Sequence, residues 1–242
     1  GWQAVCAELR REQPAPGPAY TLGGPGSAGP ACCAPVTALQ NIPVVSWLML
    51  RGRCAGCKAP ISARYPVVEV LGGLLAACAV WRFGVTPQGI AASVLLWSLL
   101  ALTMIDFDTQ LLPDSITLPL LWAGLIANLW HTFASLPDAV IGALAGYLSL
   151  WTIYWLFKLI RGKEGMGYGD FKLLAALGAW LGWQLLPVIV LLSSVVGAGI
   201  GILLIVFKGR DHSVPLAFGP YLAIAGAIAL FFGATLVKLF FP

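Results

Sequence analysis

Charged residues are scarce in this sequence. Of its 242 residues, 14 are Lys or Arg and 10 are Asp or Glu, together 10% of the chain, whereas 59% are hydrophobic. Ordinary soluble domains carry about 25% charged residues, so this chain cannot cover a water-facing surface with polar side chains. The composition therefore excludes a soluble globular enzyme. Since one membrane helix takes about 20 apolar residues, this composition predicts a multi-pass membrane protein.

Long segments contain no charge at all. They are residues 83–105, 115–137, 139–157, 173–207 and 212–237. The fourth is too long for one crossing, and Gly182, Trp183 and Pro187 mark a break that divides it in two. Residues 66–81, where Glu69 is the one charge, add a further segment. We therefore predict an all-α polytopic membrane protein with about seven transmembrane helices, near 66–82, 84–105, 115–131, 139–160, 171–185, 187–207 and 216–237.

Basic residues are almost missing from one side of the membrane in this arrangement. If residues 1–66 are cytosolic, every Lys and Arg except Arg82 and Lys238 lies in a cytosolic segment, as the positive-inside rule requires. The basic residues that give the net charge of +4 are then explained by topology, without a nucleic-acid partner. The predicted environment of the protein is a lipid bilayer. We expect residues 1–66 to form a small cytosolic domain and residues 67–242 the transmembrane domain.

The cytosolic domain contains a pattern typical of a metal site. In Arg53-Cys54-Ala55-Gly56-Cys57-Lys58, two thiolates at this spacing can bind one zinc ion, because Gly allows a tight turn between them. A cytosolic position argues against a disulfide. Candidates for the other two ligands are Cys32 and Cys33, which are adjacent and therefore poorly placed to bind one ion together. The alternative is that these cysteines are unligated thiols of a small fold.

Four aspartates are the only charged residues between positions 83 and 157: Asp106, Asp108, Asp114 and Asp138. Ionisable groups at the ends of membrane helices are candidates for function. The predicted topology places Asp106 at the cytosolic end of the second helix. It places Asp170, which follows the glycine-rich stretch from Gly165 to Gly169, at the cytosolic start of the fifth. The two carboxylates are far apart in sequence but on the same side of the membrane, where they can meet.

Two carboxylates that meet in a partly dry site share one proton. One can then activate a water while the other polarises a carbonyl, which is the chemistry of an aspartic protease. The glycines before Asp170 would let a substrate backbone approach closely. Alternatively, Asp170 only N-caps a helix that begins at Phe171. Asp108 is a substitute candidate for Asp106, and Asp114 is expected to N-cap the third helix.

Several stretches resemble the type IV prepilin peptidases. In the first 70 residues these are Asn41-Ile42-Pro43-Val44-Val45-Ser46-Trp47-Leu48, the cysteine motif, and Arg64-Tyr65-Pro66-Val67-Val68-Glu69. Further along they are Ile105-Asp106, Gln110-Leu111-Leu112-Pro113-Asp114, Leu118-Pro119-Leu120-Leu121-Trp122, the segment from Lys163 to Leu174, and Phe218-Gly219-Pro220-Tyr221. The resemblance covers about residues 31 to 235, and several motifs in the same order make it specific.

The resemblance implies a bifunctional enzyme of the bacterial inner membrane whose active site faces the cytosol. Such enzymes remove the short basic leader of type IV prepilins or type II secretion pseudopilins after a Gly. They then methylate the new N-terminus with S-adenosylmethionine. Carried over by motif, Asp106 and Asp170 are the catalytic pair, and Cys54 and Cys57 form half of a zinc site. Glu69 and Lys172 fall in matching motifs beside the catalytic region. Glu69 could act in methylation or pair with Arg64, and Lys172 could lower the pKa of a carboxylate or simply follow the positive-inside rule.

Two features depart from the family pattern. Family members usually have one more membrane helix before the cytosolic domain, so we expect such a helix upstream of Gly1. The first zinc pair of the family is usually Cys-Pro-x-Cys, and here Cys32-Cys33 stands where one cysteine of that pair should be. This points to a degenerate zinc site, which we expect to affect methylation more than proteolysis. Two other functions remain open: a presenilin-like intramembrane protease, which would hold its aspartates deep inside the helices, and a non-enzymatic, ion-coupled transporter, which would show internal repeats.

Overall fold

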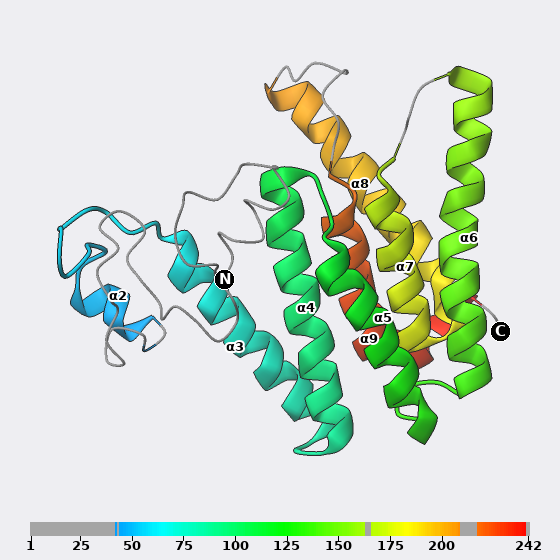
Figure 1. Ribbon diagram of the computed structural model, residues 1–242, viewed down its shortest axis with the longest axis horizontal. Coiled ribbons are helices and arrows are strands. Elements are labelled where there is room, and N and C mark those ends of the chain that lie inside the picture. The colour runs from blue at the N-terminus through cyan, green and yellow to red at the C-terminus, as the bar shows by residue number, and fades with distance from the viewer. Residues whose placement is uncertain (1–41, 43, 163–165, 209–216, 241–242) are drawn as a thin grey trace. The chain divides into compact units, whose positions relative to one another are not determined.

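The computed structural model describes residues 42, 44–162, 166–208 and 217–240, and these form helices joined by short connections (Figure 1). In chain order they are α2 (Val45–Met49), α3 (Arg64–Phe83), α4 (Pro87–Thr109), α5 (Asp114–Ala127), η2 (Asn128–Trp130), α6 (Leu136–Arg161), α7 (Tyr168–Leu181), η3 (Trp183–Leu185), α8 (Leu186–Lys208) and α9 (Gly219–Phe240). Within these residues, the one β contact is an isolated bridge between Arg53 and Pro60. The prediction of an all-α fold is confirmed for this part of the chain.

The helices from α3 to α9 lie within a few residues of the seven predicted segments. The predicted break after α7 is present, where Gly182 adopts a φ of 83° and ends the helix. Among the described residues, four segments are long and apolar enough to cross a membrane: 64–83, 87–109, 136–161 and 183–203. Helices α5 and α7 have 14 residues each. At 1.5 Å per residue each is about 21 Å long, shorter than the roughly 30 Å hydrocarbon layer.

The chain divides into two compact units, residues 1–78 and 79–242, and α3 runs from the first into the second. In the first unit, α2 lies beside the cysteine turn because Trp47 Nε1 donates a hydrogen bond of 3.1 Å to the carbonyl oxygen of Ile61. The Trp47 ring also lies against Gly52. In the same unit, the backbone N–H of Val44 donates to Glu69 Oε2 at 2.7 Å. The Glu69 carboxylate therefore ties the segment before α2 to α3.

Helix α7 is the buried centre of the second unit. It contacts α5, α6 and α9, and every residue from Leu173 to Leu181 is buried. A helix that is apolar on all sides is stable only when neighbours cover it completely. In Figure 1, α5 and α6 flank α7. The first turn of α7, which carries Asp170, is thus held by the surrounding helices.

Helices α6 and α7 touch through their backbones. A Cβ atom at Gly142 would collide with the carbonyl group of Gly178, and a Cβ atom at Gly178 would collide with that of Gly142. One turn further along α6, a Cβ atom at Gly146 would lie 2.6 Å from the carbonyl oxygen of Leu174. Small residues spaced four apart allow membrane helices to approach this closely. The glycines therefore set the position of α7 against α6.

A buried amide joins the end of α5 to the end of α7. Asn128 is fully buried, and its Nδ2 donates to two carbonyl oxygens in the last turn of α7, at 2.8 and 3.0 Å. Its Oδ1 accepts from the backbone N–H groups of Phe133 and Ala134, at 3.0 and 3.1 Å. Trp180 Nε1 on α7 donates to the carbonyl oxygen of Leu120 on α5 at 2.8 Å. Since every donor and acceptor of the Asn128 amide has a partner, these hydrogen bonds offset the cost of burying it and hold the helices together.

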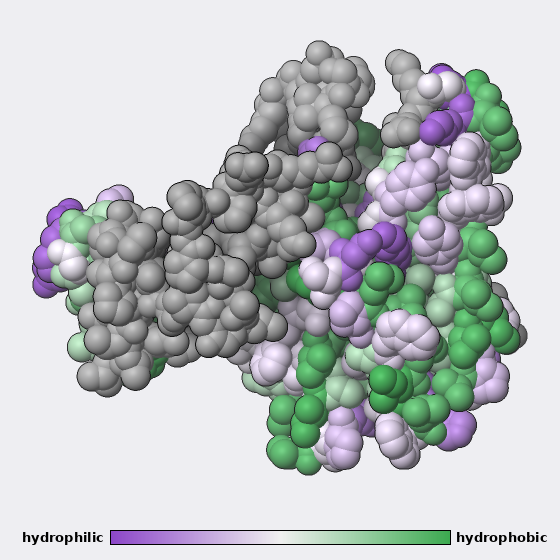
Figure 2. Space-filling model, viewed as in Figure 1, coloured by the Kyte–Doolittle hydropathy of each residue, from purple (hydrophilic) through white to green (hydrophobic). Residues whose placement is uncertain are grey.

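Large apolar side chains cover much of the outer surface of the helices. Trp97 on α4, Trp122 on α5 and Leu144 on α6 are 50%, 63% and 60% exposed. Figure 2 shows hydrophobic side chains over the visible face of α4, α5 and α6. Contiguous apolar surface of this kind is a membrane or interaction surface, because in water it would drive aggregation. The arrangement agrees with a multi-pass membrane protein.

Candidate active site

Asp106 lies in the last turn of α4, which Gln110 ends in a left-handed conformation. Its side chain is only 4% exposed. The backbone N–H of Gly219, the first residue of α9, faces the carboxylate and stabilises its negative charge. Among the described residues, Asp106 Oδ2 has no hydrogen-bond partner. A buried carboxylate oxygen without a partner is costly, and such groups are found at catalytic sites, where a water or a substrate completes the bonding.

Asp170 is the third residue of α7 and is 7% exposed. The helix begins at Tyr168, with Gly167 as its N-cap residue, so the alternative that Asp170 caps a helix starting at Phe171 is wrong. The carboxylate accepts a hydrogen bond from the backbone N–H of Gly167, as acidic side chains in a first helical turn commonly do. This bond orients the side chain, but the burial of Asp170 requires a further explanation.

The two aspartates converge at a point where four segments meet. A Cβ atom at Gly219 would lie 2.6 Å from Asp106 Oδ2 and 3.2 Å from Leu112 Cδ1. A Cβ atom at Gly169, next to Asp170, would lie 2.6 Å from Leu112 Cβ. Leu112, between α4 and α5, therefore touches the neighbours of both aspartates. The site is built from the end of α4, the α4–α5 loop and the first residues of α7 and α9.

The pKa of Asp170 responds to the nearby charge of Asp106, as expected for two carboxylates that converge. Asp170 precedes the membrane segment predicted at 171–185 and lies outside the four segments long enough to cross. Burial and, next, the negative charge of Asp106 raise the pKa of Asp170 to about 7, against the opposing hydrogen bond from Gly167. Two neighbouring carboxylates titrate as a pair, so the site holds one proton near neutral pH.

The other aspartates are not part of this site. Asp108 is exposed. Asp114 is the first residue of α5, and Pro113 occupies the N-cap position instead, so the predicted capping role of Asp114 is wrong. Its carboxylate pairs with Lys172 Nζ at 2.6 Å, which links the start of α5 to α7. The carboxylate that Lys172 contacts is thus that of Asp114.

Asp138 has a structural role at the start of α6. Its Oδ2 accepts a hydrogen bond of 2.6 Å from the hydroxyl of Ser135, the N-cap residue, and its Oδ1 accepts one of 3.0 Å from Trp183 Nε1. These bonds fix the start of α6 to the connection between α7 and α8. Of the four aspartates between 83 and 157, only Asp106 joins Asp170.

An aromatic cluster beside Asp170 was missed by the sequence analysis. Tyr154 of α6 is 3% exposed, and its ring centroid lies 5.2 Å from that of Tyr168 and 5.7 Å from that of Phe171. Tyr147 meets Phe171 edge to face, with centroids 6.0 Å apart. Aromatic residues at 147, 151 and 154, spaced three and four apart along one stretch of α6, are the signal that could have revealed it.

The cysteine motif forms a closed turn in the first unit. The backbone N–H of Cys54 donates to the carbonyl oxygen of Ala59 at 2.8 Å, and that of Lys58 donates to the carbonyl oxygen of Cys54 at 3.0 Å. Cys54 is half-buried and Cys57 is exposed. Cys32 and Cys33 lie outside the described residues. Within the residues that the structure describes, no group of three or more His, Cys, Asp or Glu side chains could hold a metal ion.

Comparisons with known proteins give consistent matches. The model of the type IV leader peptidase family matches residues 93–202, and that of the bacterial peptidase A24 N-terminal domain matches residues 8–83. A prepilin leader peptidase/N-methyltransferase of Aeromonas hydrophila is 60% identical over 221 residues, which are 91% of this chain and 76% of the relative. The protein of the same name from Pseudomonas aeruginosa is 53% identical, over 98% of this chain and 82% of its own length. No solved structure matches the chain.

Proposed function

The chain belongs to the type IV leader peptidase family and has prepilin leader peptidase and N-methyltransferase activities, and from this premise we propose that Asp106 and Asp170 form its catalytic pair. One observation carries the proposal: two buried carboxylates from α4 and α7 converge, and one oxygen, Asp106 Oδ2, has no partner among the described residues. The neighbouring aspartates are exposed or engaged in structural contacts.

In the proposed mechanism the pair works with one shared proton. Asp170, which holds the proton near neutral pH, polarises the scissile carbonyl by donating to its oxygen. Asp106 is ionised and removes a proton from a water as that water attacks the carbonyl carbon. The resulting tetrahedral intermediate collapses when its C–N bond breaks, and the leaving amine takes the proton that Asp106 received. Gly169 and Gly219 let Leu112 and the start of α9 pack closely against the pair, which holds both carboxylates in place.

The substrate and the topology belong to the same proposal. We infer that the enzyme removes the leader of type IV prepilins or type II secretion pseudopilins after a Gly, at the cytosolic face of the bacterial inner membrane. Seven crossings, from α3 to α9, put the end of α4 and the start of α7 on the same side, which favours a cytosolic position for the pair. The short helices α5 and α7 are covered by their neighbours, so they can cross within a bundle although neither spans the hydrocarbon layer alone.

Methylation of the new N-terminus requires a methyl donor, which we propose to be S-adenosylmethionine. The first unit would bind zinc through Cys54 and Cys57, with Cys32 and Cys33 as the remaining ligands. The donor types fit, since two thiols on one closed turn form half of a tetrahedral thiolate site. When bound, zinc would hold this small domain in its fold. The division into a cytosolic domain at 1–66 and a membrane domain at 67–242 is part of this proposal.

The test of the catalytic pair compares three single variants in the full-length protein in membranes. Asp106→Asn and Asp170→Asn each keep the shape of the side chain but remove its titratable proton. We expect either change to lower cleavage of a prepilin at least about a thousandfold, because each carboxylate has a step that Asn cannot perform. Asp108→Asn is the matched control and should cleave normally. Cleavage near the wild-type rate by either of the first two variants would refute the assignment.

A further inference from the structure

The connection between α4 and α5 is short and internally bonded. It comprises residues 110–113 and begins with Gln110, whose φ of 54° turns the chain out of α4. The hydroxyl oxygen of Thr109 accepts a hydrogen bond of 3.3 Å from the backbone N–H of Leu111. Pro113 is buried and occupies the N-cap position of α5, where its ring restricts the backbone. A loop this short has little freedom of its own, so the position of its residues follows from the two helix ends.

Leu112 carries the contact of this loop with the catalytic pair. A Cβ atom at Gly169 would lie 2.6 Å from Leu112 Cβ, and one at Gly219 would lie 3.2 Å from Leu112 Cδ1. Gly169 is next to Asp170 in α7, and the backbone N–H of Gly219 faces Asp106. Leu112 is thus packed between the backbones of α7 and α9. A shift of this side chain would leave both carboxylates less closely enclosed.

An ion pair joins the end of the loop to α7. Asp114 directly follows the loop, and Lys172 Nζ donates to both of its carboxylate oxygens, at 2.6 and 2.7 Å. Lys172 lies two residues after Asp170. The side chains of Lys172 and Asp114 are 27% and 55% exposed. The two charges remain partly in water, so their bond serves as a link between segments and not as the neutralisation of a buried charge.

Other contacts already hold α5 against α7. Trp180 Nε1 donates to the carbonyl oxygen of Leu120 in the buried part of the bundle, and the Asn128 amide joins the far ends of the two helices. A partly exposed ion pair adds little to stability beside such buried bonds. The pair of Asp114 and Lys172 instead restrains the near ends of α5 and α7, which lie beside the catalytic pair.

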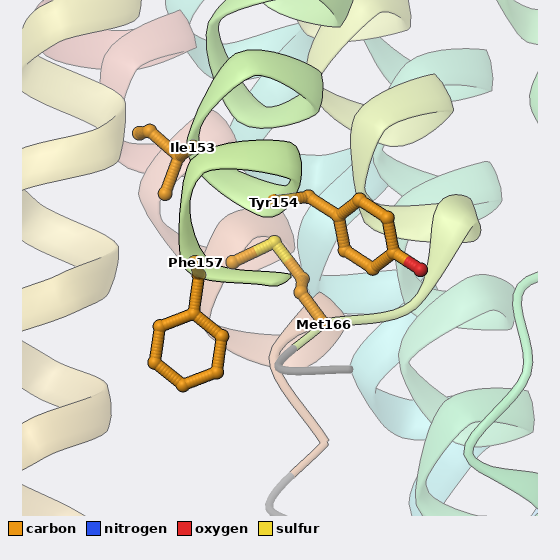
Figure 3. A pocket seen from close by; sticks show the side chains of 4 residues that line it. All are labelled: Ile153, Tyr154, Phe157 and Met166. Carbon is orange, nitrogen blue, oxygen red and sulfur yellow. The ribbon is translucent and has the colours of Figure 1, made fainter. Parts of the chain in front are cut away.

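The first turn of α7 is held on two different faces. Residues three apart share a face of a helix. Tyr168 and Phe171 therefore lie on one face, and Tyr154, which points from α6 towards the start of α7 in Figure 3, contacts both of their rings. Gly169 and Lys172 lie on another face, which meets the α4–α5 loop and α5. The ion pair thus restrains the side of this turn that the aromatic contacts do not reach.

We propose that Asp114 and Lys172 are positioning residues for prepilin cleavage. Their ion pair holds Leu112 in place and thereby keeps Asp106 and Asp170 close enough to share a proton. The inference rests on the proposed function, in which these two aspartates are the catalytic pair. Without the ion pair, the loop and the first turn of α7 can move apart. Water then enters between the carboxylates, and the geometry for proton transfer is lost in part of the molecules.

The experiment measures kcat and KM for cleavage of a prepilin by the full-length protein in membranes. Asp114→Asn and Lys172→Gln each remove the ion pair. We expect either change to lower kcat about tenfold and to change KM less than about twofold, because a misplaced pair slows the chemistry whereas neither side chain binds the substrate. The double variant should lose no more than the worse single variant, since all three lack the same contact. Lys172→Arg keeps the charge and can bond both oxygens, so its kcat should stay within about twofold of the wild type.

The pH profile of the double variant distinguishes a change of geometry from a change of charge. That variant loses one charge of each sign, so its net charge is that of the wild type. Hydration of Asp170 and a greater distance from the charge of Asp106 would both lower the pKa of Asp170. The fall of the cleavage rate above neutral pH should therefore begin at a lower pH. Asp108→Asn and Lys238→Gln, which remove exposed charges outside this pair, are the controls and should keep the wild-type kcat and pH profile.

The outcomes separate this proposal from the catalytic assignment. Unchanged kcat in both single variants would overturn the proposal, and a rise of KM alone would mean that the two side chains bind the substrate instead. Losses that add in the double variant would mean that the residues act separately. A loss that follows the amount of folded protein, with an unchanged pH profile, would mean that the ion pair serves only the fold. Cleavage near the wild-type rate by Asp106→Asn or Asp170→Asn refutes the catalytic assignment, which no result with the ion-pair variants alone can do.

Discussion

Gly219 lies so close to Asp106 that a Cβ atom at position 219 would come within 2.6 Å of Asp106 Oδ2. The backbone N–H of the same residue faces the Asp106 carboxylate. The start of α9 therefore forms one wall of the catalytic pair and supplies part of its electrostatic environment, although α9 contributes no side chain to the proposed chemistry.

Gly219→Ala should displace the Asp106 carboxylate or the start of α9. Misplacing a reacting group by about 1 Å can cost on the order of a hundredfold in rate, so we expect a loss of that size in prepilin cleavage. Gly199→Ala in α8 is the matched control, because a Cβ atom there meets nothing within 4 Å. Cleavage rates of the two variants, at equal amounts of folded protein, are the measurement. A Gly219→Ala enzyme as active as Gly199→Ala would show that Asp106 does not depend on this contact.

Gly178→Ala should weaken the packing of α6 on α7. The new methyl group would collide with the carbonyl group of Gly142 on the facing helix, and overpacking of this kind typically costs about 1–3 kcal/mol. We expect a lower free energy of unfolding in detergent and, because α7 carries Asp170, reduced cleavage as well. Gly73→Ala in α3, where a Cβ atom meets nothing within 4 Å, should not be destabilised. Equal unfolding curves for the two variants would contradict the close approach of α6 and α7.

The pH dependence of cleavage follows from the shared proton. Burial and the charge of Asp106 raise the pKa of Asp170 to about 7, so the pair loses its proton as the pH rises through that value. We expect the cleavage rate to be highest near or below neutral pH and to fall about tenfold for each further pH unit above it. The rate is measured between pH 5 and 9, and Asp108→Asn should keep the same profile. A rate that rises through this range would mean that the pair works without a proton.

Zinc content tests the proposed metal site independently of proteolysis. If Cys54 and Cys57 bind zinc together with Cys32 and Cys33, the purified full-length protein should contain about one zinc per chain. Cys54→Ser and Cys57→Ser should each lose it, while cleavage at the aspartate pair continues. Cys78→Ser is the control, since Cys78 lies on α3 away from the motif. A wild type with well below one zinc would mean that the adjacent Cys32 and Cys33 do not complete a site.

The positions of the helices could be predicted from the distribution of charge. Long uncharged segments must be helical in a membrane, because each backbone polar group needs an internal partner there. The break at Gly182 was also predictable, since a glycine followed closely by Pro187 interrupts a helix. Helix ends were less certain: α7 begins three residues before Phe171, so Asp170 lies inside its first turn and does not cap it.

Contacts between distant segments could not be predicted. Nothing in the sequence around Asp114 shows that its carboxylate would pair with Lys172, 58 residues away. The same is true of Asn128, whose amide bonds reach the last turn of α7. Such contacts depend on how the helices cross, and neighbouring positions on a helix surface have no fixed partner until those crossings exist.

The distribution of charge along the chain is enough to predict an all-helical membrane protein with a few aspartates near helix ends as candidate catalytic residues. The family motifs point to Asp106 and Asp170, but the burial of these two together, with Asp108 and Asp114 left exposed, depends on how the helices pack. Residues two apart on a helix point in different directions, so Asp106 turns inward where Asp108 stays exposed. Asp106 is buried because α9 begins with a residue small enough to lie against it, and Asp170 because α7 is covered on several sides.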